Sequence, residues 1–189
     1  MLFLEGEKRM VRAKIKGMGA LKKQLKSVPK ITRTALQETI KKVTEEIAST
    51  ASLNVQTTTI HGTGELANSI SADHEEWFGS PVSIVRTNSP IGTFREFGTG
   101  SVGEASEKDL PDGINPVYTQ DEWFFPVESV DKDLNALYGM RVVNIKGTEF
   151  YVTNGQPARP FLYPAYKAET ENMDKLVKEN VSKALKEKL

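Results

Sequence analysis

One glycine pattern in the sequence is typical of nucleotide-binding loops: G-x-G-x-x-G, at Gly98 to Gly103. In a dinucleotide site this pattern lies between a hydrophobic strand and a helix, so that the pyrophosphate meets the helix N-terminus. Here acids and prolines follow Gly103, and no helical periodicity does. The pattern therefore predicts a turn-rich loop without a cofactor.

Two other patterns with catalytic or metal-binding precedents are incomplete. The segments Ser27 to Lys30 and Ser129 to Lys132 match S-x-x-K, but the sequence lacks the S-D-N and K-T-G partners that acyl-enzyme chemistry needs. Residues 131–142 begin like a calcium-binding loop, yet positions six and twelve are Ala136 and Val142 instead of glycine and glutamate. We expect neither activity.

Histidine and carboxylates cluster at one place, Asp73-His74-Glu75-Glu76, and His61 is the only other histidine. On a strand, successive side chains point to opposite faces, so these four could not converge on one metal ion. The segment is interpreted as a solvated strand end. No catalytic, cofactor-binding or metal-binding residue is predicted.

The composition is that of an ordinary globular protein of 189 residues with no cysteine and a formal net charge of zero. No run approaches the roughly 20 apolar residues of a membrane span. The first residues become charged too soon for a signal peptide. We therefore expect a soluble protein, made in the cytoplasm, with no membrane partner and no small-molecule substrate.

Charge is unevenly distributed along the chain. Residues 8–33 contain ten Lys or Arg and no acid, whereas residues 62–131 contain thirteen Asp or Glu and three basic residues. Two readings remain open: separate solvated faces, or a basic end that meets the acidic flank of a neighbouring subunit. The basic segment lacks the aromatic residues that stack on bases, so sequence-specific nucleic-acid binding is not expected.

The hydrophobic pattern predicts an α+β fold in a single domain, residues 1–189: an N-terminal strand and long helix packed on an antiparallel sheet, with a long C-terminal helix. The long helix is expected over 31–53, after a short helical face that ends at Pro29. The C-terminal helix is expected over 164–189. The expected strands are 10–16, 66–72, 82–87, a short buried one at 123–125, and 141–153 with a turn at Lys146-Gly147.

The segment Gly98 to Glu122 has four Gly, two Pro and six acids against one Lys. Such a composition cannot bury enough apolar surface to offset the entropy of ordering. We expect a flexible acidic loop over 98–122.

Four segments together resemble the tail-completion and head–tail joining family of long-tailed phages and prophages, the group that includes the lambda minor tail protein Z. The first is the strand, glycine and leucine-containing turn that lead through Pro29 into a long helix. The others are Thr63-Gly64-Glu65-Leu66 with Ser69-Ile70 (T-G-x-L-x-x-S-I), Glu96-Phe97-Gly98-Thr99 (E-F-G-T) and Pro160-Phe161-Leu162-Tyr163-Pro164-Ala165 (P-F-L-x-P-A). Two departures are Ile91-Gly92, where the family often has Tyr-Ala, and the long 98–122 loop.

The resemblance implies a structural virion assembly protein that completes the tail and joins it to the head, as a homo-oligomeric ring such as a hexamer. Its partners would be other tail and head–tail connector proteins. Its location would be the tail or neck of the virion, and the host cytoplasm during assembly. The motif residues expected to have structural roles are Gly64, Leu66, Glu96, Phe97, Gly98, Thr99, Pro160, Phe161, Leu162 and Pro164.

Physical reasoning suggests what some motif residues do. Gly64 and Gly98 would supply backbone geometry that other residues resist. Phe94 and Phe97 would pin their segment to the core. Pro160 and Pro164 would stiffen the entry to the last helix, which Phe161 and Leu162 anchor.

The alternative function is that of a small cytoplasmic bacterial enzyme, a hydrolase that uses the acidic central region. No convergent histidine, cysteine or carboxylate motif supports this alternative.

Overall fold

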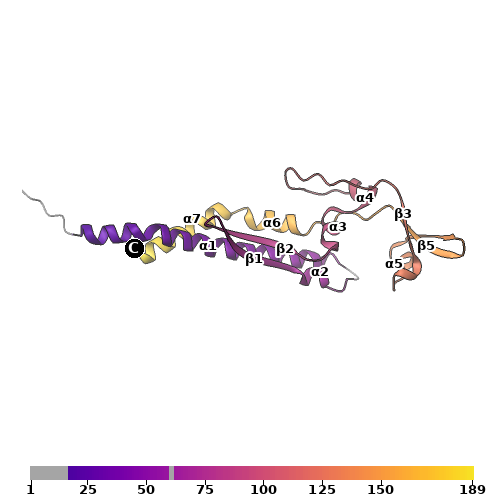
Figure 1. Ribbon diagram of the computed structural model, residues 1–189, viewed down its shortest axis with the longest axis horizontal. Helices are drawn as coiled ribbons and strands as arrows, with labels where there is room; N and C mark the ends of the chain where they lie inside the picture. Colours follow the sequence, from indigo (N-terminus) through magenta and orange to yellow (C-terminus); the bar gives the residue numbers. More distant parts are fainter. Residues whose placement is uncertain (1–16, 60–61) are drawn as a thin grey trace, which may run out of the picture.

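The computed structural model describes residues 17–59 and 62–189. The predicted strand at 10–16 lies outside these residues. The longest helix, α1 (Met18–Thr57), has 40 residues and is roughly 60 Å long. Figure 1 shows an elongated molecule in which the remaining elements lie along α1 or beyond its C-terminal end. No helix in the described ranges is long and apolar enough to cross a membrane.

The prediction that α1 begins after Pro29 is wrong, because the helix runs continuously through this residue. Pro29 removes one hydrogen bond, which would join its nitrogen to the Leu25 carbonyl. Leu25 lies in a part of the helix that is exposed to solvent, so water can hydrate the freed carbonyl. Gly17, with φ +91°, directly precedes α1, and Gly19 lies inside the helix.

A two-stranded antiparallel hairpin covers one side of α1. Strand β1 (Ile70–Trp77) pairs with β2 (Ser80–Thr87), with Ile70 opposite Thr87 and Trp77 opposite Ser80. The strand predicted over 66–72 is correct only from residue 70, because residues 65–68 form a short helix, α2 (Glu65–Asn68). The predicted strand at 82–87 lies within β2.

The main core lies where α1, α2 and the C-terminal helices meet. Apolar residues at helical spacing on α1 (Val43, Ile47, Ala51, Val55) pack with Leu66, Ala67, Phe161 and Ala165. Ile70 and Val85 from the hairpin and Leu162, Met173 and Leu176 pack partly buried against this cluster.

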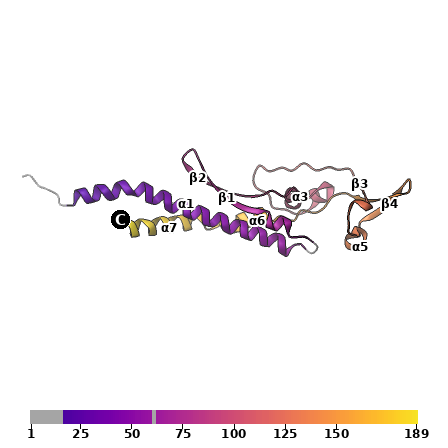
Figure 2. The ribbon, with the colours of Figure 1, turned by 60° about the horizontal axis from the view of Figure 1, so that its bottom comes forward.

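The predicted C-terminal helix is interrupted. The structure has α6 (Leu162–Thr170) and α7 (Met173–Lys188), separated at Glu171-Asn172. Both lie along α1 (Figures 1 and 2). None of the described residues of α7 is fully buried, so its apolar stripe is only half covered.

A second sheet lies at the far end of the molecule, with strand order β3-β5-β4. Its strands are β3 (Trp123–Pro126), β4 (Arg141–Ile145) and β5 (Thr148–Thr153). Two short helices, η1 (Val127–Ser129) and α5 (Leu134–Tyr138), lie between β3 and β4 in the sequence. The predicted turn is confirmed, since Lys146 and Gly147 both have positive φ between the paired strands. Strand β3 is not buried as predicted, because Phe124 faces solvent.

The mixed helix and strand class is therefore as predicted, with antiparallel pairing in both sheets. The 98–122 segment is not entirely a loop. It follows α3 (Ile91–Phe97) and begins with α4 (Gly100–Ala105), whereas residues 106–122 lack regular structure.

Candidate functional site

Glu96 is the buried acid around which the site is built, with only 8% of its surface exposed. It lies on α3, and its carboxylate accepts hydrogen bonds from three consecutive backbone N–H groups at the start of α6. The distances are 2.8 Å from Phe161, 3.0 Å from Leu162 and 2.9 Å from Tyr163. The first N–H groups of a helix have no partner within it, and Phe161 provides no side-chain cap. Glu96 is therefore a helix cap supplied from another element.

Gly98 and Thr99, the last two residues of E-F-G-T, hold the end of α3 close to the 156–158 segment. The Glu96 cap and this contact together form what we call the joint. Gly98 has φ +77°, and a Cβ at this position would lie 2.7 Å from the Ala158 nitrogen and 2.7 Å from the Gly103 Cα. The backbones of Thr99 and Gln156 exchange hydrogen bonds of 3.0 and 3.2 Å as an antiparallel bridge. The glycine is needed both for its conformation and because the two backbones are close.

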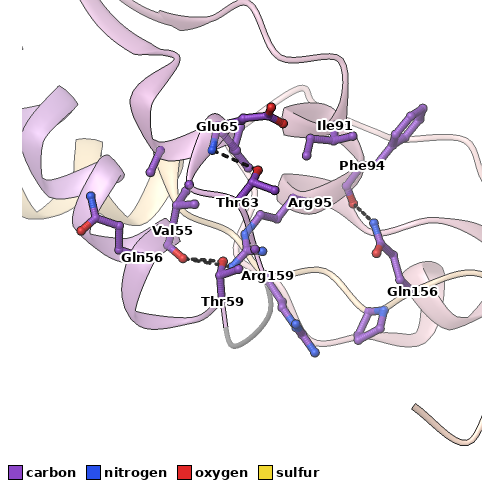
Figure 3. Close-up of a pocket in the computed structure, with 15 residues that line it drawn as sticks. Val55, Gln56, Thr59, Thr63, Glu65, Ile91, Phe94, Arg95, Gln156 and Arg159 are labelled. Carbon is purple, nitrogen blue, oxygen red and sulfur yellow. Dashed lines mark hydrogen bonds between the residues drawn. The ribbon is translucent and has the colours of Figure 1, made fainter. Parts of the chain in front are cut away.

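A hollow of about 390 Å³ lies beside this joint, bounded by the end of α1, α2, α3 and the 156–159 segment (Figure 3). Arg95 projects from α3 and donates to the Thr58 hydroxyl at 2.7 Å and to the Val55 carbonyl at 3.4 Å. Its backbone carbonyl accepts from the Arg159 N–H at 2.8 Å. Burial, and then the charge of Arg159, lower the pKa of the Arg95 guanidinium.

The two arginines give this hollow its chemical character. Both line it, and the buried Arg95 Nε has no hydrogen-bond partner among the described residues. A guanidinium is suited to carboxylate or phosphate recognition. Neither arginine was predicted as a site residue from the sequence, although each lies next to a motif: Arg95 directly precedes E-F-G-T, and Arg159 directly precedes P-F-L-x-P-A.

The motif residues lie in different environments. Leu66 and Phe161 are in the core, Leu162 packs partly buried against it, and Pro160 is half-buried. Pro164 is exposed in the first turn of α6, where a missing N–H costs little. Gly64 has φ +81° and precedes α2.

The expectation for the two phenylalanines needs correction. Phe94 is half exposed and does not reach the core, because it lies on the outer side of the short α3. Phe97 is half-buried, and its carbonyl accepts a hydrogen bond of 2.9 Å from the Tyr118 hydroxyl. This bond ties the 106–122 segment to the joint.

The glycine pattern at residues 98–103 does open a helix, contrary to the expectation of a loop alone. This helix, α4, has six residues and follows α3 instead of a hydrophobic strand. Gly100 and Gly103 pack closely against the 154–156 backbone, which explains the glycines without a phosphate.

The acids and the histidine of residues 73–76 have separate neighbours. The His74 Nδ1 lies 3.0 Å from the Ser83 hydroxyl, and Asp73 pairs with Arg86. Glu76 pairs with Arg33. Within residues 17–59 and 62–189, no three His, Asp or Glu side chains are grouped closely enough to hold a metal ion.

Comparisons of the chain with protein-family models, with curated proteins and with solved structures gave no match.

Proposed function

We propose that the chain is a structural virion assembly protein of a tailed bacteriophage or prophage, which completes the tail and joins it to the head as a homo-oligomeric ring. The observation that supports this function is the joint at Glu96. Segments that resemble three separate family motifs meet there: Glu96 caps α6 at Phe161, and Leu66 shares the core with Phe161. The motif residues thus have mutual structural roles, as an assembly protein requires.

The acidic region favours this function over a hydrolase. Glu96 holds three backbone N–H groups, Asp73 pairs with Arg86 at 2.6 Å, and Glu122 pairs with Arg141 at 2.7 Å. General acid–base catalysis needs a carboxyl group within reach of a substrate. These acids instead bind neighbouring groups of the protein.

The proposed partners are other tail and head–tail connector proteins, and the proposed location is the neck of the virion. Arg95 and Arg159 line the hollow together with Glu65, and their guanidinium groups are suited to an acidic side chain of such a partner.

Electron microscopy of purified particles tests the function. The label would be a small tag at Leu189, which is exposed at the end of α7. The expected result is density at the junction of head and tail, and deletion of the gene should leave separate heads and tails. Tagged protein that is absent from particles, or that lies elsewhere on them, would overturn the proposal. A particle with a tagged tail-tube subunit is the matched control for labelling.

A further inference from the structure

The N-terminal end of α1 carries apolar side chains that nothing in the described chain covers. Every residue from 17 to 26 is exposed, and α1 extends past the end of α7 (Figures 1 and 2). Met18, Leu21 and Leu25 are spaced by three and four residues and form one stripe, with Leu25 60% exposed. An apolar stripe of this kind is typical of a helix that binds in a groove.

The same chain has an unfilled apolar groove on its body, with a volume of about 940 Å³. Its floor and walls come from α1, β2, α3, α6 and the first residues of α7, and Tyr166 lies at its edge, 52% exposed. The apolar residues that line it include Ile40, Val85, Phe97, Pro111, Leu162 and Met173. The groove is of a size that holds a substantial apolar ligand.

Charge on the two features is complementary. Lys22, Lys23 and Lys26 flank the stripe, and residues 17–33 contain no acid. Asp174 lines the groove, and Asp112 follows Pro111 at its rim. Among the described residues, neither aspartate has an ion pair, whereas Asp109 at the same rim pairs with Lys167. Two unpaired rim acids are therefore available where lysines could approach.

A subunit cannot place its own stripe in its own groove. The groove is built on residues 40–47 of the helix that carries the stripe at 18–25, and α1 is continuous between them. An unbroken helix cannot turn back on itself, so the occupant must come from another molecule.

We propose that the stripe of Met18, Leu21 and Leu25 of one subunit binds in the groove of a second copy of the chain. The contact joins two different surfaces and is therefore heterologous, so repeating it gives a ring if the rotation closes. This inference deepens the proposed ring and rests on the proposed function for its biological setting.

Matched variants at exposed positions test the contact. Leu25→Asp damages the stripe, Tyr166→Lys damages the groove, and Leu53→Asp is the control, because Leu53 is 54% exposed on α1 but lies outside both surfaces. Sedimentation velocity should show concentration-dependent association of the wild-type chain and of Leu53→Asp. Each of the other two variants should associate at least about tenfold more weakly.

Mixing the two variants is the decisive step. Leu25→Asp retains an intact groove and Tyr166→Lys an intact stripe, so an equal mixture should form dimers and nothing larger. A mixture that stays monomeric would overturn the contact, as would a wild-type chain that is monomeric at about 1 mM.

Cross-linking provides an independent readout, because the chain has no cysteine. The double variant Leu25→Cys with Tyr166→Cys should form a ladder of disulfide-linked oligomers on oxidation, whereas Leu53→Cys with Tyr166→Cys should not. Equal ladders from both pairs, or none, would overturn the contact. A specific ladder from a protein that microscopy finds away from the head–tail junction would retain the contact and refute the proposed function. A protein that lies at the junction but gives no ladder would retain the proposed function and refute the contact.

Discussion

Glu96 and Phe161 are 65 residues apart in the sequence, yet the Glu96 carboxylate accepts a 2.8 Å hydrogen bond from the Phe161 N–H. The same carboxylate binds the next two N–H groups of α6, which would otherwise lack partners. One side chain thereby fixes where the C-terminal helices leave the joint.

Replacing this acid should destabilise the whole fold. Glu96→Ala leaves buried N–H groups unpaired and should lower the free energy of unfolding by about 2–4 kcal/mol, measured by urea denaturation. Glu96→Gln retains one acceptor oxygen and should lose less. Glu187→Ala, an exposed acid on α7, is the control and should change stability by less than about 0.5 kcal/mol. Equal stability of Glu96→Ala and the control would refute the capping role.

Two glycines with similar φ angles differ in how crowded their surroundings are. Gly98 has φ +77° and is crowded by backbone atoms at 2.7 Å, whereas Gly113 has φ +82° and open space where a Cβ would lie. Gly113→Ala should cost about 1 kcal/mol from its conformation alone. Gly98→Ala should cost about 3 kcal/mol or more, because the 98 and 158 backbones must also separate. Thermal melts of both variants would compare the costs, and equal costs would show that the close approach is unimportant.

The docking of α7 is tested at Leu176, which packs partly buried against the main core. Leu176→Asp puts an unpaired charge there and should lower stability by about 2–3 kcal/mol. Ser182→Asp changes an exposed residue of the same helix and serves as the control. A Leu176→Asp melting temperature within a degree or two of wild type would mean that α7 is undocked in the free subunit.

The sequence predicted those parts of the fold that depend on local patterns. The helical spacing of Ile40, Val43 and Ile47 predicted α1, and the Lys146-Gly147 turn predicted the β4–β5 hairpin. Local rules failed at Pro29, where they predicted the end of a helix. The helix continues through Pro29, because the carbonyl that loses its hydrogen bond is exposed and can be hydrated. They failed again at Glu171-Asn172, where the apolar stripe continues although the helix is interrupted.

The site could be predicted only in part. The E-F-G-T and P-F-L-x-P-A segments were identified as important, but no local pattern shows that Glu96 caps the helix that begins at Leu162. The groove is built from α1, β2, α3, α6 and α7, which span residues far apart in the sequence, so it exists only after folding. The exposed Leu21 and Leu25 were assigned to a short helical face, because apolar spacing alone does not reveal whether a face is covered.

Self-association should depend on salt. If lysines at 22–26 approach Asp112 and Asp174 of a second copy, raising the salt concentration from about 0.05 to 0.5 M should weaken association, because exposed charges are then screened. Light scattering across the series measures this. The double variant Asp112→Asn with Asp174→Asn should lose most of the salt dependence. Association that strengthens with salt would indicate an interface governed by apolar contact alone.

The segment after α4 is tied to the rest of the chain by a few side chains, among them Tyr118 and Asp109, but parts of it are open to solvent. The Tyr118 hydroxyl donates to the Phe97 carbonyl, and the Lys108 ammonium lies 5.1 Å from the centre of the Tyr118 ring. Between them, Val117 is 98% exposed. We expect amides at 109–117 to exchange rapidly with solvent in the isolated subunit, since few of them have backbone partners.

Assembly should change this exchange if the segment contacts a partner. Hydrogen exchange in the purified particle should then show protection near Val117, and Val117→Ser should weaken incorporation into particles without lowering the stability of the subunit. Tyr118→Phe, which removes only the hydroxyl, is the internal comparison and should lower subunit stability by about 1 kcal/mol. Rapid exchange in both states would exclude docking through this segment. Deletion of residues 113–115, which spares Pro111 and Asp112 of the groove rim, should then leave assembly intact, because the bond between Tyr118 and Phe97 would still hold the shortened segment.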